Sequence, residues 1–252
     1  MRILHQFHSG PEPCHYLPDR DATQEYVQVG QLSPSEYEDL MNRGWRKFGP
    51  MLFHPVCDGC AECRPIRIPA EGFTPDRSQR RTWQRNADLT VRYAQPTVDA
   101  ARMDLYRRYH AAQAVYKGWP DMDRTEKGYA FQFVRSPLPA VEISVWEGDL
   151  LRAVALTDIT PNVVSGVYHF HEPDCRQRGL GTFVMLHTIE LARRLGRRWA
   201  YFGYYVAGCA SMSYKTNFRP SEILGTDGVW RDSQSIGLNP ASEPGTMQVT
   251  PS

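Results

Sequence analysis

The sequence predicts a mixed α/β (α+β) fold, and three observations lead to this class. The second half of the chain carries short patterned segments in the order strand, strand, strand, helix, strand. The first half carries helices with recognisable start and stop signals. The 252 residues are 41% hydrophobic and 23% charged, which is ordinary globular composition with enough apolar residues for a substantial core.

The composition and the patterning of the sequence predict three regions. Residues 1–95 form an N-terminal region with clustered cysteines and a basic helix, and residues 96–232 form a second region with the strand-rich order. Residues 233–252 are rich in Ser, Pro and Gly, a composition that predicts a disordered tail.

Three helices are predicted before residue 120. Ser33 caps the first, Glu36 completes a capping box and Gly44 ends it. Residues 76–89 and 98–116 have helical spacing as well. A short strand and a turn are expected over residues 66–73, between the first two helices.

The second half predicts a sheet and one long helix. Gly148 and Asp149 form a hairpin signal between two alternating segments. The strands are expected at residues 141–147, 150–158, 163–170 and 199–206, with an amphipathic helix over residues 178–196.

The charge balance limits the kind of partner. The 29 basic and 28 acidic residues leave a net charge of +1, so a polyanion must be met by a local basic patch. The sequence has no apolar run long enough for a membrane span and no signal-peptide pattern, which predicts a cytoplasmic protein without a membrane partner. In a reducing compartment, clustered cysteines indicate metal or redox chemistry more often than disulfides.

A glycine turn is expected between the third strand and the long helix. Arg176, Gly179 and Gly181 form the pattern R-x-x-G-x-G. Glycines allow close backbone approach, and a helix N-terminus offers unpaired N–H groups, so the pattern is typical of a phosphate or oxyanion cradle. A plain glycine turn is the alternative.

The helix over residues 76–89 concentrates positive charge. Arg77, Arg81 and Arg85 are spaced four apart and share one face, with Arg80 beside them and Trp83 close by. This is either a solvated charged face or a surface on which guanidiniums meet RNA phosphates and a ring meets bases.

Three of the six cysteines lie within seven residues. Cys57, Cys60 and Cys63 have the spacing C-x2-C-x2-C, and Cys14 is the expected fourth ligand, with His15 or His54 in reserve. Four such ligands suit zinc or an iron–sulfur cluster, whereas three buried small hydrophobic residues are the alternative. The two remaining cysteines are expected to be structural.

A strand meander, a glycine turn, a helix and a further strand resemble the N-acetyltransferase (GNAT) fold, in which this turn grips the pyrophosphate of acetyl-CoA. The chain as a whole resembles the aminoacyl-tRNA–protein transferases of the N-degron pathway. The resemblance covers about residues 14–224 and is carried by PCHYLP, GWRKFG, FHPVCDGCAECRPIRI, SQRRTWQRN and YFGYYVAGCASMSYKTNFRPSEIL.

This resemblance implies transfer of an amino acid from aminoacyl-tRNA, the co-substrate, to the N-terminal Asp or Glu of acceptor proteins, which marks them for degradation. The compact length resembles the leucine-transferring bacterial branch, with arginine as the alternative. No cofactor is required for transfer, although the resemblance supports a metal or cluster at the four cysteines. The catalytic candidates lie in the last motif: Tyr204, Tyr205, Tyr214 and Lys215.

Two other function classes stay open. An acetyl-CoA-dependent N-acetyltransferase would explain the glycine turn but neither the arginine helix nor the cysteines. A zinc-bearing RNA-binding module would leave the GNAT-like half without a role. No DNA partner is expected.

Overall fold

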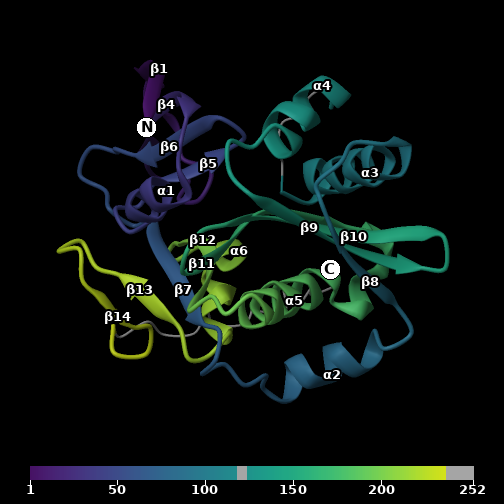
Figure 1. Cartoon of the computed structure of the whole chain (residues 1–252). Coiled ribbons are helices and arrows are strands. Elements are labelled where there is room, and N and C mark those ends of the chain that lie inside the picture. The colour runs from purple at the N-terminus through teal and green to yellow at the C-terminus, as the bar shows by residue number, and fades with distance from the viewer. Residues whose placement is uncertain (118–123, 237–252) are drawn as a thin grey trace, which may run out of the picture.

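The computed structural model describes residues 1–117 and 124–236 and contains a large mixed sheet with helices on both faces (Figure 1). The sheet has eight strands in the order β14-β13-β7-β12-β11-β10-β9-β8, and only β11 and β12 run parallel to each other. The strands are β7 (Arg64–Pro69), β8 (Thr90–Ala94), β9 (Ala140–Glu147), β10 (Leu150–Ile159), β11 (Val163–His171), β12 (Trp199–Tyr205), β13 (Glu222–Leu224) and β14 (Trp230–Asp232).

Helices cover the two faces of this sheet unequally. On one face lies α5 (Leu180–Arg194), and α2 (Arg77–Arg85) packs against its outer side (Figure 1). On the other face lie α3 (Ala100–Lys117), α4 (Glu126–Tyr129) and the π-helix η1 (Ala130–Val134). Short helices connect the rest: η2 (Pro173–Arg178), α6 (Ala210–Ser213) and η3 (Tyr214–Asn217).

A second, four-stranded sheet lies in the N-terminal part, in the order β1-β4-β6-β5. Its strands are β1 (Arg2–His8), β4 (Gln24–Gln31), β6 (Met51–Pro55) and β5 (Arg46–Phe48), with a small pair, β2 (Glu12–Pro13) and β3 (Asp21–Ala22), beside it. Helix α1 (Pro34–Met41) has the predicted capping box, since Ser33 and Glu36 each accept a hydrogen bond from the other's backbone N–H.

The predicted class and the order of elements are confirmed. The succession of β9, β10, β11, glycine turn, α5 and β12 is the GNAT-like order expected from the sequence. The apolar stripe of α5 is buried as expected at Leu180, Phe183 and Leu191, whereas Leu195 is 41% exposed just beyond the helix.

The eight-stranded sheet draws strands from both sides of residue 95, because β7 and β8 precede this position and pair with later strands. At the other end, Ser233 is buried and its hydroxyl lies 2.8 Å from that of Ser221. Residues 237–252, most of the predicted tail, lie outside the described residues. No helix of the described residues is both long and apolar enough to cross a membrane.

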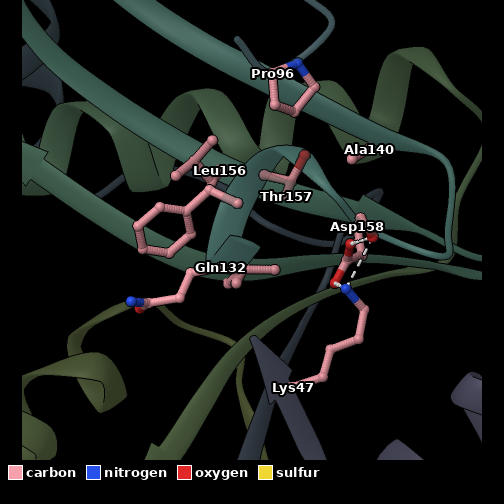
Figure 2. Close-up of a pocket in the computed structure, with 10 residues that line it drawn as sticks. Lys47, Pro96, Gln132, Ala140, Leu156, Thr157 and Asp158 are labelled. Carbon is pink, nitrogen blue, oxygen red and sulfur yellow. Dashed lines mark hydrogen bonds and ion pairs between the residues drawn. The ribbon is translucent and has the colours of Figure 1, made fainter. Parts of the chain in front are cut away.

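A buried ion pair joins the two sheets. Lys47 Nζ of β5 lies 2.9 Å from Asp158 Oδ2 of β10, and these side chains are 1% and 2% exposed (Figure 2). Lys47 also donates to the Ser136 hydroxyl at 2.9 Å. The cavity beside the pair has a volume of about 10 Å³, too small for a substrate, so the pair is structural.

Candidate active site

The glycine turn lies at the carboxyl end of β11 and begins α5. Gly179 has φ +64°, a left-handed conformation that glycine adopts without a steric penalty, and it is the N-cap of α5. No side chain caps this helix end, so its first N–H groups are available to a ligand. Arg176 is exposed in η2 just before the turn, with its guanidinium 3.6 Å from the centre of the Tyr116 ring.

Strands β11 and β12 separate before β11 reaches this turn. They pair with each other only over Val163–Ser165 and Trp199–Tyr201, whereas the pairing of β12 with β7 and of β11 with β10 continues beyond this stretch. In open sheets, ligands bind outside the carboxyl ends of parallel strands where neighbouring connections diverge. We name the residues grouped here the splay site: Tyr109, His169, His171, Gly181 and Tyr214.

Four side chains are grouped at this splay site, near the end of β11 and the start of α5. His169 and His171 alternate along β11, are partly exposed, and lie within 3.7 Å of where a Cβ on Gly181 would stand. The ring of Tyr109, from α3, is 5.3 Å from that of His171, and burial raises the pKa of Tyr109 to about 12, which keeps its hydroxyl protonated. Tyr214 donates to the thioether of Met185 at 3.4 Å, a weak acceptor that a substrate oxygen can replace.

Three of these residues were not predicted as site residues from the sequence: Tyr109, His169 and His171. A signal existed for the two histidines, which are two apart on the strand that leads directly into the glycine turn. Tyr109 has no such signal, because only the packing of α3 against β11 brings it here.

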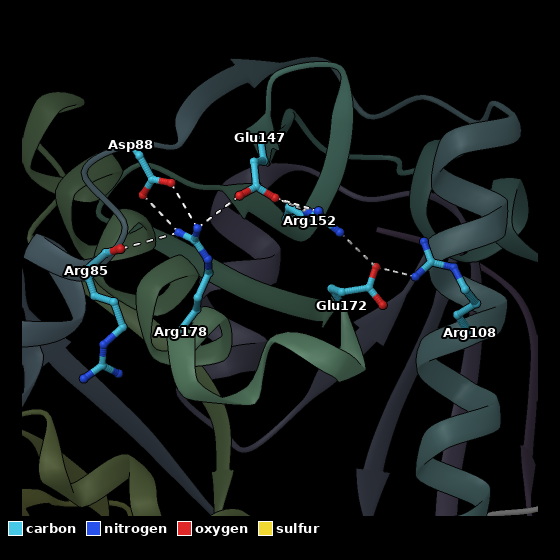
Figure 3. A network of polar contacts seen from close by, with 7 residues as sticks. All are labelled: Arg85, Asp88, Arg108, Glu147, Arg152, Glu172 and Arg178. Carbon is cyan, nitrogen blue, oxygen red and sulfur yellow. Dashed lines mark hydrogen bonds and ion pairs between the residues drawn. The ribbon is translucent and has the colours of Figure 1, made fainter.

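A chain of ion pairs holds the turn in place (Figure 3). Arg178 makes two contacts with Asp88, at 2.9 and 3.0 Å, and a third with Glu147 at 3.0 Å. Glu147 pairs with Arg152 at 2.6 Å, and Glu172 joins Arg152 to Arg108 of α3. The turn is thereby tied to the β9–β10 hairpin, to α3 and to the segment after α2.

Helix α2 runs up to the same turn. Its N-cap Asp76 forms a capping box with Gln79, and the buried side chains of Gln79 and Thr82 are its anchor to the protein. At its end, the Asn86 amide donates to the carbonyl oxygen of Arg178 at 2.8 Å, and Arg85 donates to that of Gln177. The predicted helix is confirmed, and its four arginines are all exposed: Arg77, Arg80, Arg81 and Arg85.

Three of the four catalytic candidates lie away from the splay site. Tyr204 donates to the Gly44 carbonyl oxygen at 2.6 Å, and Lys215 donates to the carbonyl oxygen of Tyr204 at 2.6 Å. Both side chains are buried, and burial lowers the pKa of Lys215 to about 7. Tyr205 is buried in the core beneath α5. Tyr214 is therefore the member of the set that reaches the splay site.

The four expected ligands come close together but are not arranged for a metal. They are Cys14, Cys57, Cys60 and Cys63. Cys57 accepts from the backbone N–H of Thr23 at 3.4 Å, and Cys60 accepts from Arg20 at 3.3 Å. Burial raises the pKa of Cys63 to about 12, and the other three thiols add to this shift. Residues 1–117 and 124–236 contain no group of three or more His, Cys, Asp or Glu side chains placed to hold an ion. As placed, the thiols do not fit a four-ligand zinc or iron–sulfur site.

Comparison with known proteins gives a consistent picture. Family models described as the N terminus and the C terminus of arginine-tRNA-protein transferase match residues 12–81 and 101–225. An aspartate/glutamate leucyltransferase of Pseudomonas fluorescens is 40% identical over 216 residues, covering 85% of this chain and 91% of the relative. One from Pseudomonas putida is 41% identical over 221 residues, with the same coverage.

Among solved structures, L-PGS from Bacillus licheniformis covers 86% of this chain and 81% of its own, with 13% identity and a TM-score of 0.48. At this score the likeness carries no information on substrate. The identity to the leucyltransferases, over nearly their whole length, is decisive, and the chain belongs to the family of aminoacyl-tRNA–protein transferases and is an enzyme of that family.

Proposed function

We propose that the protein transfers leucine from leucyl-tRNA to the N-terminal Asp or Glu of acceptor proteins, and so marks them for degradation. The observation that carries this proposal is the 40% identity, over 216 residues, to a relative named aspartate/glutamate leucyltransferase. Because aminoacyl-tRNA is the donor, we place the reaction in the cytoplasm.

The donor is an ester and is already activated, so the proposed transfer needs no cofactor and no covalent enzyme intermediate. The acceptor is an α-amine whose pKa is near 8, so a useful fraction is neutral at cellular pH. The main task of the enzyme is then to hold the amine against the ester carbonyl carbon.

The splay site offers suitable groups for each part of the reaction. The uncapped N-terminus of α5, with Gly179 and Gly181, suits the terminal phosphate of the tRNA acceptor end, and exposed Arg176 flanks it. The hydroxyl of Tyr214 is suited to donate to the oxyanion of the tetrahedral intermediate. A histidine of β11, either His169 or His171, can accept the proton that the amine loses on attack.

The arginines of α2 are proposed to bind the tRNA body. They are exposed, they line a helix that ends at the glycine turn, and a guanidinium pairs well with phosphate. Tyr204, Tyr205 and Lys215 are proposed to act indirectly, by holding the end of β12 and the following segment in place. Their support is burial and, for Lys215 and Tyr204, hydrogen bonds to backbone oxygens.

The test is a transfer assay with labelled donors. Leucyl-tRNA, arginyl-tRNA and acetyl-CoA are supplied separately, with peptides that begin with Asp, Glu, Arg or Lys. The proposal expects labelled leucine on the peptides that begin with Asp and Glu, and no acetylation. Acetyl transfer from acetyl-CoA without tRNA would make the protein an N-acetyltransferase, and arginine as the preferred donor would overturn the choice of leucine.

A further inference from the structure

A pocket of about 210 Å³ lies in the groove between α2 and α5, on the side of the molecule that carries the arginines. Its walls come from the segment before α2, from α2 itself and from the outer face of α5: Phe73, Pro75, Trp83, Leu186, Ile189, Glu190 and Arg193. The volume is below that of an ordinary small-molecule site and suits one flat ring system.

Trp83 is the aromatic wall of this pocket. Its indole is 38% exposed although it is a large apolar group. The ring is held from within the protein, because His187 stacks on it at 4.6 Å and 25° and Phe183 meets it edge-on at 5.8 Å. Burial lowers the pKa of His187 to about 4, so this partner is a neutral ring at cellular pH. Trp83 is therefore a pre-positioned stacking surface.

The rim of the pocket carries charges of both signs. Arg80 donates to the carbonyl oxygen of Pro75 at 2.6 Å, which places its guanidinium next to the wall that Pro75 forms. The guanidiniums of Arg77 and Arg81 make no hydrogen bond or ion pair with any residue that the structure describes. On the α5 side, the carboxylate of Glu190 accepts from Arg193 and Arg194, both at 2.9 Å, and borders the cavity.

A nucleotide matches this arrangement. A base can stack on an aromatic ring, its exocyclic amine can donate to a carboxylate, and its phosphate can meet a neighbouring guanidinium. A base inside a duplex cannot enter, since its faces are covered by its neighbours. The pocket begins at Leu186, about 8 Å along the axis of α5 from Gly181 at the splay site.

We propose that this pocket binds one unpaired nucleobase from the single-stranded acceptor end of the donor tRNA, stacked on Trp83, with the adjacent phosphate on Arg80. The inference rests on the proposed function, which supplies the tRNA. It assigns Trp83 and the α2–α5 groove a part in positioning the acceptor end, in addition to the charge of the α2 arginines.

Binding of uncharged RNA tests this proposal. Two probes of equal length are compared by fluorescence anisotropy: a single strand that ends in CCA, and the same strand fully paired with its complement. The wild type is expected to bind the single strand more tightly. Trp83→Leu, which keeps an apolar group against His187, is expected to lose about 10-fold in affinity for the single strand and little for the duplex.

Phe7→Leu is the matched control, since Phe7 is also a stacked aromatic residue, 40% exposed, but lies on β1. It is expected to bind both probes like the wild type. Equal wild-type affinities for the two probes, or unchanged single-strand binding by Trp83→Leu, would overturn the proposal. Tight binding of cytidine monophosphate alone would show a general nucleotide site and would also overturn it.

The assay uses neither charged tRNA nor acceptor, so its failure leaves the proposed transfer intact. Conversely, absent leucine transfer together with Trp83-dependent single-strand binding would reject the proposed function while leaving the base-binding pocket in place.

Discussion

Two groups of basic residues in this protein have opposite surroundings. The α2 arginines, Arg77, Arg80, Arg81 and Arg85, are exposed. Of these side chains, Arg80 and Arg85 each donate to a backbone carbonyl oxygen. The buried basic set consists of Arg46, Lys47, Arg102 and Lys215. Each of these side chains contacts a carboxylate or carbonyl oxygen of the protein. An exposed cation without an anion is free to meet a phosphate, whereas a buried basic group depends on oxygen partners inside the protein.

The largest expected effect is on stability, from the buried set. Asp158→Ala removes the carboxylate 2.9 Å from Lys47 and leaves a buried cation unpaired. Such a loss costs about 3–5 kcal/mol, measured as the free energy of unfolding in urea. Asp227→Ala is the control, because Asp227 pairs with Arg231 at the surface and its loss should change stability little. If both variants lost the same free energy of unfolding, burial would not explain how much a charge contributes to stability.

Lys215 gives the buried set a pH signature. Its folded pKa of about 7 lies below the ordinary 10.5, so between these values the unfolded chain binds more protons than the folded one. Stability from this group therefore rises as pH increases from about 7 towards 10, and is smallest below pH 7. Compared with Lys215→Met, the wild type should gain a few kcal/mol over this range, visible in melting temperatures at pH 6.5, 8 and 9.5. Parallel pH profiles for the two proteins would contradict the placement of Lys215.

A substitution at Gly179 tests the role of the glycine turn, which lies between the exposed arginines of α2 and the splay site. Gly179→Ala forces a side chain into a left-handed conformation and should cost about 1 kcal/mol. Gly148→Ala, in the β9–β10 turn with φ +58° and nothing within 4 Å, should cost about as much stability. Leucine transfer should fall only in Gly179→Ala, since that change disturbs the start of α5. A similar loss of transfer in both variants would point to general destabilisation.

Much of the fold was predictable because local signals agree with it. The capping box of α1, the periodicity of α5 and the hairpin at Gly148 are each written within a few neighbouring residues. The four-stranded sheet was not foreseen, since β1 is exposed along its whole length and shows no alternation of burial. In β4, the alternation of Val27 and Val29 was the signal available.

The site was predictable only in part, for a physical reason. The glycine turn and the arginine helix are local patterns, and the structure brings them together. The surroundings of Lys215 depend on tertiary packing, so the sequence could not show that its ammonium binds the carbonyl oxygen of Tyr204. GWRKFG and SQRRTWQR look equally basic, but only the second faces solvent.

The salt dependence of tRNA binding tests most directly the claim that the α2 arginines bind the donor. The dissociation constant for leucyl-tRNA is measured from 50 to 200 mM salt for the wild type, Arg77→Gln/Arg81→Gln, and a control with two other exposed arginines replaced, Arg43→Gln/Arg219→Gln. The account predicts that the α2 variant binds more weakly, with its log–log slope reduced by about 2, that the control matches the wild type, and that all three proteins are equally stable. An α2 variant whose affinity and slope equal those of the wild type would contradict the account.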